Sequence, residues 1–231
     1  MSQHQAERSP RPEIGPGAVL VHHRRGVPVI AESAYIAPTA VICGDVHIGA
    51  HSRVLFGAVI TAEGGSVKIG DNCVIMENAV VRGVPGHPAQ LGDHVLVGPH
   101  AHLSGCTVEG DTRIATGAMV FNGARIETGA DIEFHALVHV NTVIPAGTAV
   151  PMGWFAGGDP AELVAPDQWE RIRAMMGRLD YPGTVFGVGE PNDADRNVPD
   201  MARRYARRLA LHRNDYILNP QHYTVRSTAG G

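Results

Sequence analysis

Residues 108–150 read VEGDTRIATGAMVFNGARIETGADIEFHALVHVNTVIPAGTAV, with an aliphatic side chain at every sixth position. In a β-strand, residues two apart share a face, so each aliphatic residue and the small residue often found two places before it both point inward. The glycine, asparagine and aspartate residues between them favour turns. Each six-residue unit therefore predicts a short strand and a turn, and three units would close one triangular coil of about 18 residues.

The same spacing reaches back to residue 36, with two longer gaps and one shortened step, and it sorts the inward positions into three faces. Face A carries Ile42, Ile60, Val81, Leu103, Val120 and Val138; face B carries Ile48, Ile69, Leu91, Val108, Ile126 and Ile144; face C carries Ile36, Val54, Ile75, Val97, Ile114, Ile132 and Val150. The two gaps, 61–68 and 82–90, both connect face A to face B. We expect them to project from one corner, where inserted loops often carry function.

The repeat predicts an all-β fold, a left-handed parallel β-helix, followed by C-terminal α-helices. The expected parts are an N-terminal extension (1–32), the β-helix (33–152), an exit loop with the helices (153–218) and a flexible tail (219–231). The first helix should start at a cap formed by Asp167 and end near residue 179, and the second should run from residue 199 or 200 to about 213. A loop is expected between them, at 181–198.

Composition excludes several classes of protein. Charged residues are 18% of the chain and the formal net charge is −4, whereas nucleic-acid binding needs a basic surface. The 3 cysteines have the spacing of neither a disulfide framework nor a CxxC zinc motif. The polar N-terminus does not look like a signal segment, and no apolar run is long enough to span a bilayer. We expect a cytoplasmic protein with no membrane association.

The stretches LFGAVITAEGGSVKIGDNCVIMENAVV (55–81), LGDHVLVGPHAHLSGCTVEGDTRIATGAMVFNGARI (91–126) and VPMGWFAGGDPAELVAP (150–166) carry distinctive features beyond the repeat. These are the positions of the two gaps, the shortened step at 105–108 and the closing Gly-Asp-Pro-Ala segment. Together they resemble the γ-class carbonic anhydrase family of hexapeptide proteins, over roughly residues 33–166. The resemblance implies a homotrimer that holds a divalent metal, zinc or iron, with three histidines at each subunit interface.

The resemblance does not carry over to the metal ligands. It places the three histidines of the family at Arg82, Pro99 and Ser104 of this chain. The family's Arg-Gly-Asp loop falls at Thr61 and Glu63, and its Gln-Asp pair at Met76 and Glu77. Zinc needs three protein ligands and a water for carbonic anhydrase chemistry. The resemblance therefore implies the scaffold, and the activity is not assigned by default.

Other polar residues stand where the family holds its metal. The outward residues that follow the inward positions of face A make one column: Cys43, Thr61, Arg82, Ser104, Phe121 and His139. His102 points outward from the same strand as Ser104, but neighbouring outward residues lie about 7 Å apart, too far for a direct hydrogen bond. His100 lies in the turn just before.

These positions give the candidate catalytic residues. His102 is the candidate general base, and Arg82 is the candidate holder of a carboxylate or phosphate. Glu63, Glu77 and Ser104 complete the catalytic candidates. The alternative for the two glutamates is a surface ion pair with Arg82 or Lys68, worth about 0–1 kcal/mol.

Histidines are also candidate ligands for a re-sited divalent metal, zinc or iron. We name His100, His102 and His139, to which a neighbouring protomer could add a further ligand. The alternative is that some of the 13 histidines lie near an interface by chance. The histidines at 22, 23, 47, 51 and 94 are predicted to be solvated surface residues.

Three functions stay open at this point. The first is a trimeric enzyme whose altered site between subunits hydrates, dehydrates or hydrolyses a small carboxylate. The second is an acyl-CoA-dependent acyltransferase of the hexapeptide class, with His100, His102 or His139 as base. The third is a non-catalytic trimer that binds a small molecule at the subunit boundary.

Overall fold

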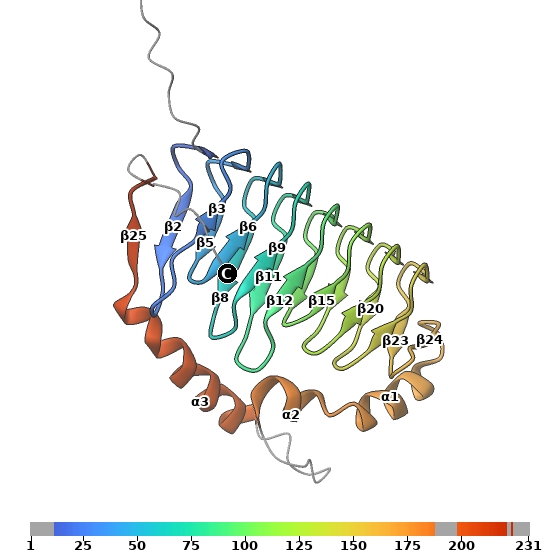
Figure 1. The fold of residues 1–231 in the computed structure, drawn as a ribbon. Coiled ribbons are helices and arrows are strands. Elements are labelled where there is room, and N and C mark those ends of the chain that lie inside the picture. The colour runs from blue at the N-terminus through green and yellow to red at the C-terminus, as the bar shows by residue number, and fades with distance from the viewer. Residues whose placement is uncertain (1–11, 188–197, 221–222, 224–231) are drawn as a thin grey trace, which may run out of the picture.

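The computed structural model describes residues 12–187, 198–220 and 223. The chain is a parallel β-solenoid of about eight turns followed by helices (Figure 1), which confirms the predicted fold class. The three predicted faces are three sheets, and the paired strands place every inward position on the face that the repeat assigned to it. These side chains and the small residues two places before them form one continuous buried core.

Face A is a 10-stranded sheet, and it carries the column of outward residues from Cys43 to His139. Its parallel strands are β2 (Val19–His22), β5 (Val41–Cys43), β8 (Val59–Ala62), β11 (Val80–Gly83), β14 (His102–Ser104), β17 (Met119–Val120), β20 (Leu137–Val138) and β23 (Phe155–Gly157). An antiparallel strand closes each end: β24 (Glu162–Val164) pairs with β23, and β25 (Tyr216–Leu218) pairs with β2.

The other two faces consist of very short strands. Face B contains β3 (Val29–Ile30), β6 (Val46–Ile48), β9 (Val67–Ile69), β12 (Ala89–Leu91), β15 (Thr107–Val108), β18 (Arg125–Ile126) and β21 (Val143–Ile144). Face C contains β1 (Glu13–Ile14), β4 (Tyr35–Ile36), β7 (Arg53–Val54), β10 (Val74–Ile75), β13 (Leu96–Val97), β16 (Arg113–Ile114), β19 (Asp131–Ile132) and β22 (Ala149–Val150).

The solenoid starts before the predicted boundary at residue 33. Strands β1, β2 and β3 pair with β4, β5 and β6, so residues 13–30 already form a coil. Ile14, Leu20 and Ile30 supply its inward positions. The step from Leu20 to Ile30 contains a loop at 23–28, which breaks the six-residue spacing, so the repeat does not predict this coil. That loop connects face A to face B, like the two gaps predicted further along.

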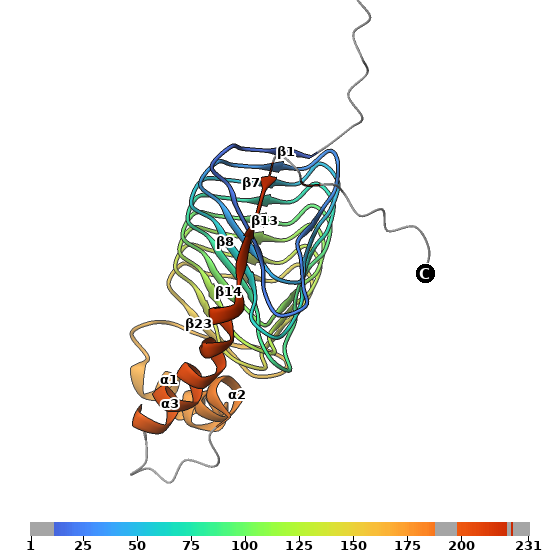
Figure 2. The same cartoon turned by 90° about the vertical axis from the view of Figure 1, so that its left-hand side faces the viewer.

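After the solenoid, residues 169–187 and 198–218 form an arm that returns along its side. It contains α1 (Trp169–Arg178), α2 (Tyr181–Phe186), α3 (Val198–Leu209), a 3-10 helix (Ala210–Asn214) and β25. The arm runs from β23 back to β2 (Figure 1), where β25 pairs with β2, and Figure 2, seen from that end, shows the helices grouped at one lower corner of the coils. Ile172 and Met175 fix its first helix against Phe155 and Val164.

Both predicted helices are present, with three differences. The first helix is capped at Gln168 without a side-chain hydrogen bond, so the predicted cap at Asp167 is wrong. The predicted loop contains α2, where Asp180 accepts a hydrogen bond from the backbone of Gly183. Strand β25 was not predicted, because its partner β2 is far away in the sequence. Residues 188–197 and most of the predicted flexible tail lie outside the described residues.

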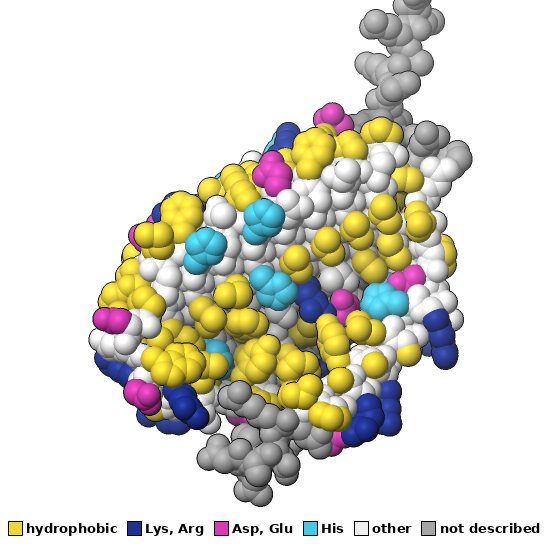
Figure 3. All heavy atoms as spheres, turned by 180° about the vertical axis from the view of Figure 1, so that it is seen from behind, with side chains coloured by type: hydrophobic (Ala, Val, Ile, Leu, Met, Phe, Trp, Pro, Cys, Tyr) yellow, Lys and Arg dark blue, Asp and Glu magenta, His cyan; other side chains and the backbone are white. Residues whose placement is uncertain are grey.

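One corner of the solenoid exposes large hydrophobic side chains. Phe56, Phe134 and Met152 are 50%, 45% and 62% exposed, and each follows the end of a face C strand by two residues. Figure 3 shows a side of the molecule on which hydrophobic and uncharged side chains predominate. None of the helices in the described part of the chain has the length and apolar character needed to cross a bilayer.

Candidate functional site

The predicted column on face A is confirmed by strand register. Arg82 pairs with Thr61 on one side and with Ser104 on the other, and Cys43 pairs with Thr61. Each column residue follows an inward residue, which holds its backbone in the sheet and directs its side chain outward. The arm covers this column, so Thr61 and Ser104 are only 7% exposed although they point away from the core.

Between face A and the arm lies a pocket of about 210 Å³. The solenoid contributes Arg82, His102 and Phe121 to its wall, and the arm contributes Tyr181, Phe186 and Tyr205. The remaining lining residues are His23, Glu63, Val84, Pro85, Ser104, Asn122, Val185, Arg208, Leu209 and His212. The pocket is therefore formed within one chain, whereas the sequence placed the candidate site between protomers.

Arg82 connects the parts of the chain that form this pocket. Its Nη2 donates a hydrogen bond of 2.7 Å to Oε2 of Glu63 and another to the hydroxyl of Tyr205. Glu63 comes from the first predicted loop, so this loop does reach the column, and the predicted alternative of an ion pair with Arg82 is what the structure shows. Tyr205 comes from α3, so the same guanidinium joins the loop, the sheet and the arm.

His102 is half-buried in the pocket wall on β14. Burial lowers the pKa of its imidazole, and the nearby positive charge of Arg82 lowers it further. His102 is therefore neutral at neutral pH and can accept a proton, as a general base must. Ser104, also on this strand, lines the same pocket.

Glu77 and His100 lie elsewhere. Both are in the turns between face C and face A, where the backbone N–H of His100 donates to the carbonyl of Glu77. Neither belongs to the wall of the pocket described above. The part of the sequence-based candidate set that one chain brings together is thus Arg82, Glu63, His102 and Ser104.

One chain does not bring together the three predicted metal ligands either. The ring of Phe121 lies between two of them, with centroids 6.2 Å from His102 and 6.3 Å from His139. His100 is exposed in its turn. His139 is 3% exposed and packs against Phe155 at 5.4 Å and Tyr181 at 5.7 Å. The repeat placed Phe121 in the column between Ser104 and His139, and its ring keeps the two imidazoles apart.

Burial of His139 leads to a prediction about stability. Among the described residues its Nδ1 has no hydrogen-bond partner, and a buried polar atom left in this state costs about 1–3 kcal/mol. His139→Phe should therefore raise the free energy of unfolding by about 1 kcal/mol at neutral pH. Burial also lowers the pKa of His139. As pH falls below about 6.5, the unfolded chain takes up the proton first, so the wild type loses stability in this range and the variant loses less.

Urea denaturation at about pH 7.5 and about pH 5.5 measures both effects. His47→Phe is the matched control, because the side chain of His47 is 40% exposed and its imidazole pairs with Asp45 at 3.2 Å. A variant at His139 with the same acid destabilisation as the wild type would contradict this explanation.

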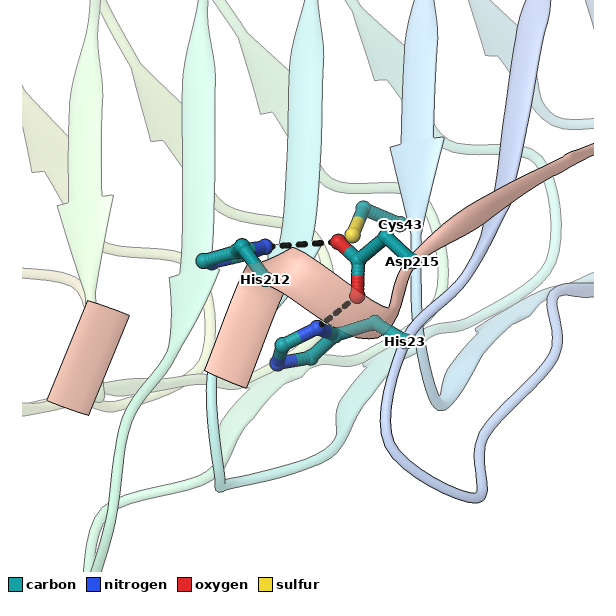
Figure 4. A group of neighbouring side chains, drawn as sticks. All are labelled: His23, Cys43, His212 and Asp215. Atoms are coloured by element: carbon teal, nitrogen blue, oxygen red, sulfur yellow. Dashed lines mark hydrogen bonds and ion pairs between the residues drawn. The ribbon is translucent and has the colours of Figure 1, made fainter. Parts of the chain in front are cut away.

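A second group of polar side chains lies at one end of the pocket, and sequence reasoning missed it. The ligand atoms of His23, Cys43, His212 and Asp215 all lie within 4.8 Å of one another (Figure 4). Asp215 bonds Nδ1 of His23 at 2.6 Å and Nδ1 of His212 at 2.7 Å. The two imidazoles stack, with centroids 4.1 Å apart.

His23 was predicted to be solvated, and this is wrong, because the arm covers it and leaves it 2% exposed. His22 is partly buried, and its ring stacks on Tyr216 of β25 at 4.4 Å. Burial raises the pKa of the Cys43 thiol to about 11, with a further rise from Asp215. The spacing of His212 and Asp215, three residues apart, was the one local hint in the sequence that these two side chains act together.

Comparison with known proteins gives partial matches. No protein-family model matches the chain. It is 36% identical over 101 residues to "Gamma carbonic anhydrase 1, mitochondrial" of Arabidopsis thaliana, covering 41% of this chain and 37% of that protein. It is 30% identical over 104 residues to "Carbonic anhydrase" of Geobacillus kaustophilus, covering 45% of this chain and 57% of that protein. The chain thus matches these relatives over less than two thirds of their length.

Among solved structures, the chain is similar to UDP-N-acetylglucosamine O-acyltransferase from Moraxella catarrhalis, with a TM-score of 0.47, 18% identity and coverage of 86% of this chain and 94% of that one. It is also similar to a hexapeptide transferase family protein from Anaplasma phagocytophilum, with a TM-score of 0.46, 21% identity and coverage of 81% and 97%. The chain is a hexapeptide β-helix protein that is distantly homologous to γ carbonic anhydrases.

Proposed function

We propose that this γ-carbonic-anhydrase-like chain is an enzyme that hydrates, dehydrates or hydrolyses a small molecule bearing a carboxylate. The reaction takes place in the pocket between face A and the arm. The observation that carries the proposal is the presence of Arg82, a fixed cation, and His102, a neutral imidazole, in the wall of one pocket. A cation can hold the carboxylate while a neutral imidazole accepts a proton.

The charge of the pocket favours an anion. Its wall includes two guanidinium groups, Arg82 and Arg208, and one carboxylate, Glu63. Glu63 and Tyr205 bond only Nη2 of Arg82, so the other edge of this guanidinium can meet a carboxylate. Phe121, Tyr181 and Phe186 add apolar walls, which suit a flat, apolar body on the same molecule.

His102 supplies the chemistry in this proposal. In hydrolysis it takes a proton from a water that attacks the carbonyl carbon of an ester, and it returns that proton to the alkoxide oxygen that departs when the C–O bond breaks. In hydration of a carbonyl it returns the proton to the oxyanion that the attack forms, and dehydration is the reverse of this step. Ser104 can donate a hydrogen bond to that oxygen. Glu63 acts indirectly, by holding Arg82 in place.

The metal that the resemblance implies does not fit the corresponding positions of this chain. Arg82 presents a cation bonded to Glu63, which would repel a metal ion. Pro99 has no donor atom, and the hydroxyl of Ser104 is a weak ligand. The proposed reaction therefore uses no metal at these positions, and it differs from that of the carbonic anhydrases named above.

Thermal denaturation with benzoate and with benzamide tests the pocket. The two probes have nearly the same shape, and only benzoate offers a carboxylate. At about one hundred times its dissociation constant, benzoate should raise Tm by about 5–10 °C, and benzamide at equal concentration should have little effect. Equal shifts with both probes, or no shift with benzoate, would contradict the proposal.

The homotrimer stays a prediction, as does the cytoplasmic location. What supports the trimer is the corner that exposes Phe56, Phe134 and Met152, because an apolar row of this kind is typical of an interface. The residues that carry the proposed chemistry, Arg82, His102 and Ser104, all come from one chain, so the proposal calls on no residue of a second protomer.

A further inference from the structure

We propose that His23, Cys43, His212 and Asp215 form a zinc site that fastens the arm to the solenoid. The four ligand atoms already lie within 4.8 Å of one another. The proposal is independent of the carboxylate chemistry, because it concerns different residues and a different ligand. It also differs from the predicted metal set of His100, His102 and His139, with which it shares no residue.

The spacing of the ligand atoms is close to what zinc requires. In a tetrahedral site with bonds of about 2.0–2.3 Å, neighbouring ligand atoms lie about 3.3–3.6 Å apart. Small side-chain rotations would bring the four atoms to these separations. Asp215 now bridges the two imidazoles at 2.6 Å and 2.7 Å, so both rings already point Nδ1 at the same carboxylate (Figure 4).

The donor set selects the type of metal. Two imidazole nitrogens, one sulfur and one carboxylate oxygen suit zinc, whereas magnesium and calcium take oxygen ligands. Hydrogen bonding alone would account for the two histidines and the aspartate, which satisfy one another. These bonds do not include the sulfur of Cys43, which interacts with the side chain of Thr61 and which a zinc ion would bind as thiolate with release of a proton to solvent.

The ligands come from two parts of the fold that are distant in sequence. His23 directly follows β2 and Cys43 is the last residue of β5. They are 2% and 6% exposed, so the solenoid holds both side chains in place. His212 and Asp215 belong to the arm, at the step from the 3-10 helix into β25. A zinc ion would therefore link two ligands, His23 and Asp215, that are 192 positions apart in the sequence.

The site also borders the pocket. His23 and His212 line one end of it, and Leu209, just before the 3-10 helix, is part of its roof. Zinc would thus keep α3 and its side chain Tyr205 over the column on face A. Four protein ligands leave no open position, so the ion has a structural role here.

Cobalt substitution tests the site directly. The full-length chain is stripped with a chelator and titrated with Co²⁺, and the absorption of a cobalt–thiolate bond in the near ultraviolet is followed. We expect one equivalent per chain, tetrahedral visible bands and displacement of Co²⁺ by Zn²⁺. The affinity for Zn²⁺ is then measured by competition with a chromophoric chelator.

Two variants and one control make the test specific. Cys43→Ala should abolish the cobalt–thiolate band, and His212→Asn, in the arm, should weaken zinc binding more than about 100-fold, since loss of an outer partner alone costs about 10- to 100-fold. Cys106→Ala removes a buried thiol outside the cluster and should leave the band unchanged. Absence of the band in the wild type, or its persistence in Cys43→Ala, would overturn the proposal.

A second readout does not depend on the variants folding well. In the wild type, zinc should slow backbone hydrogen exchange in the 3-10 helix and β25, and leave the last coils of the solenoid unchanged. If zinc binds but hydrogen exchange in the 3-10 helix and β25 does not change, zinc does not hold the arm against the solenoid. Both readouts are made without benzoate, so failure of the carboxylate proposal would not affect them.

Discussion

His102→Asn should lower kcat/KM for hydrolysis of 4-acetoxybenzoate by about 10²- to 10⁴-fold, the usual contribution of a positioned general base. This probe has a carboxylate for Arg82 and an ester carbon for a water activated by His102. Asparagine keeps a polar side chain of similar size, but its amide cannot take up a proton near neutral pH. Release of the phenol product, followed by absorbance, measures the rate.

The pH profile gives a second readout of the same group. Burial and the charge of Arg82 lower the pKa of His102, so the wild type should keep its activity down to below about pH 6.5 and lose it as the imidazole becomes protonated. His139→Asn is a suitable comparison for the substitution, because His139 is absent from the pocket wall. If the wild type hydrolyses the probe no faster than buffer does, the proposed activity is contradicted. Equal rates in the wild type and His102→Asn would show that His102 is not the base.

Arg82→Met should weaken benzoate binding by about 10- to 150-fold. Hydrogen bonds to charged groups contribute about 1.5–3 kcal/mol, and methionine keeps the length of the side chain without the charge. The same change removes the positive charge that lowers the pKa of His102, so the acid limb of the activity profile should move to higher pH. Calorimetric titration and the pH profile measure the two effects.

Arg113→Met is the matched control for charge. Arg113 also forms an ion pair with a carboxylate, Asp131, but it lies on face C and its side chain is 44% exposed. It removes the same charge from the chain and should change neither benzoate affinity nor the acid limb. If both variants lose the same affinity, the effect comes from net charge and Arg82 has no special role.

Much of the fold could be predicted because the six-residue spacing is a local property. Each inward residue and the small residue before it fix one strand and one turn, so the register alone places Arg82 beside Ser104. The first coil was missed where this local rule fails, at the loop between Leu20 and Ile30. Glu63 could be placed near the column because its loop leaves from a known corner.

The rest of the site depends on contacts between distant parts of the chain. Tyr205 meets Arg82 and Asp215 meets His23 only because the arm returns along face A, and that return is fixed by the pairing of β25 with β2. Neither helix propensity nor the repeat contains this information. For the same reason the sequence predicts a surface position for His23, although the arm buries it.

The central claim is that a small carboxylate binds between face A and the arm. Hydrogen exchange with and without benzoate tests it most directly, because it locates the bound probe on the chain. We predict slower exchange in β11, β14 and α3, and no change along the open groove on face B that is lined by Lys68, Gln90 and Thr107. Protection confined to face B, or no protection in β11, β14 and α3 at saturating benzoate, would contradict the claim.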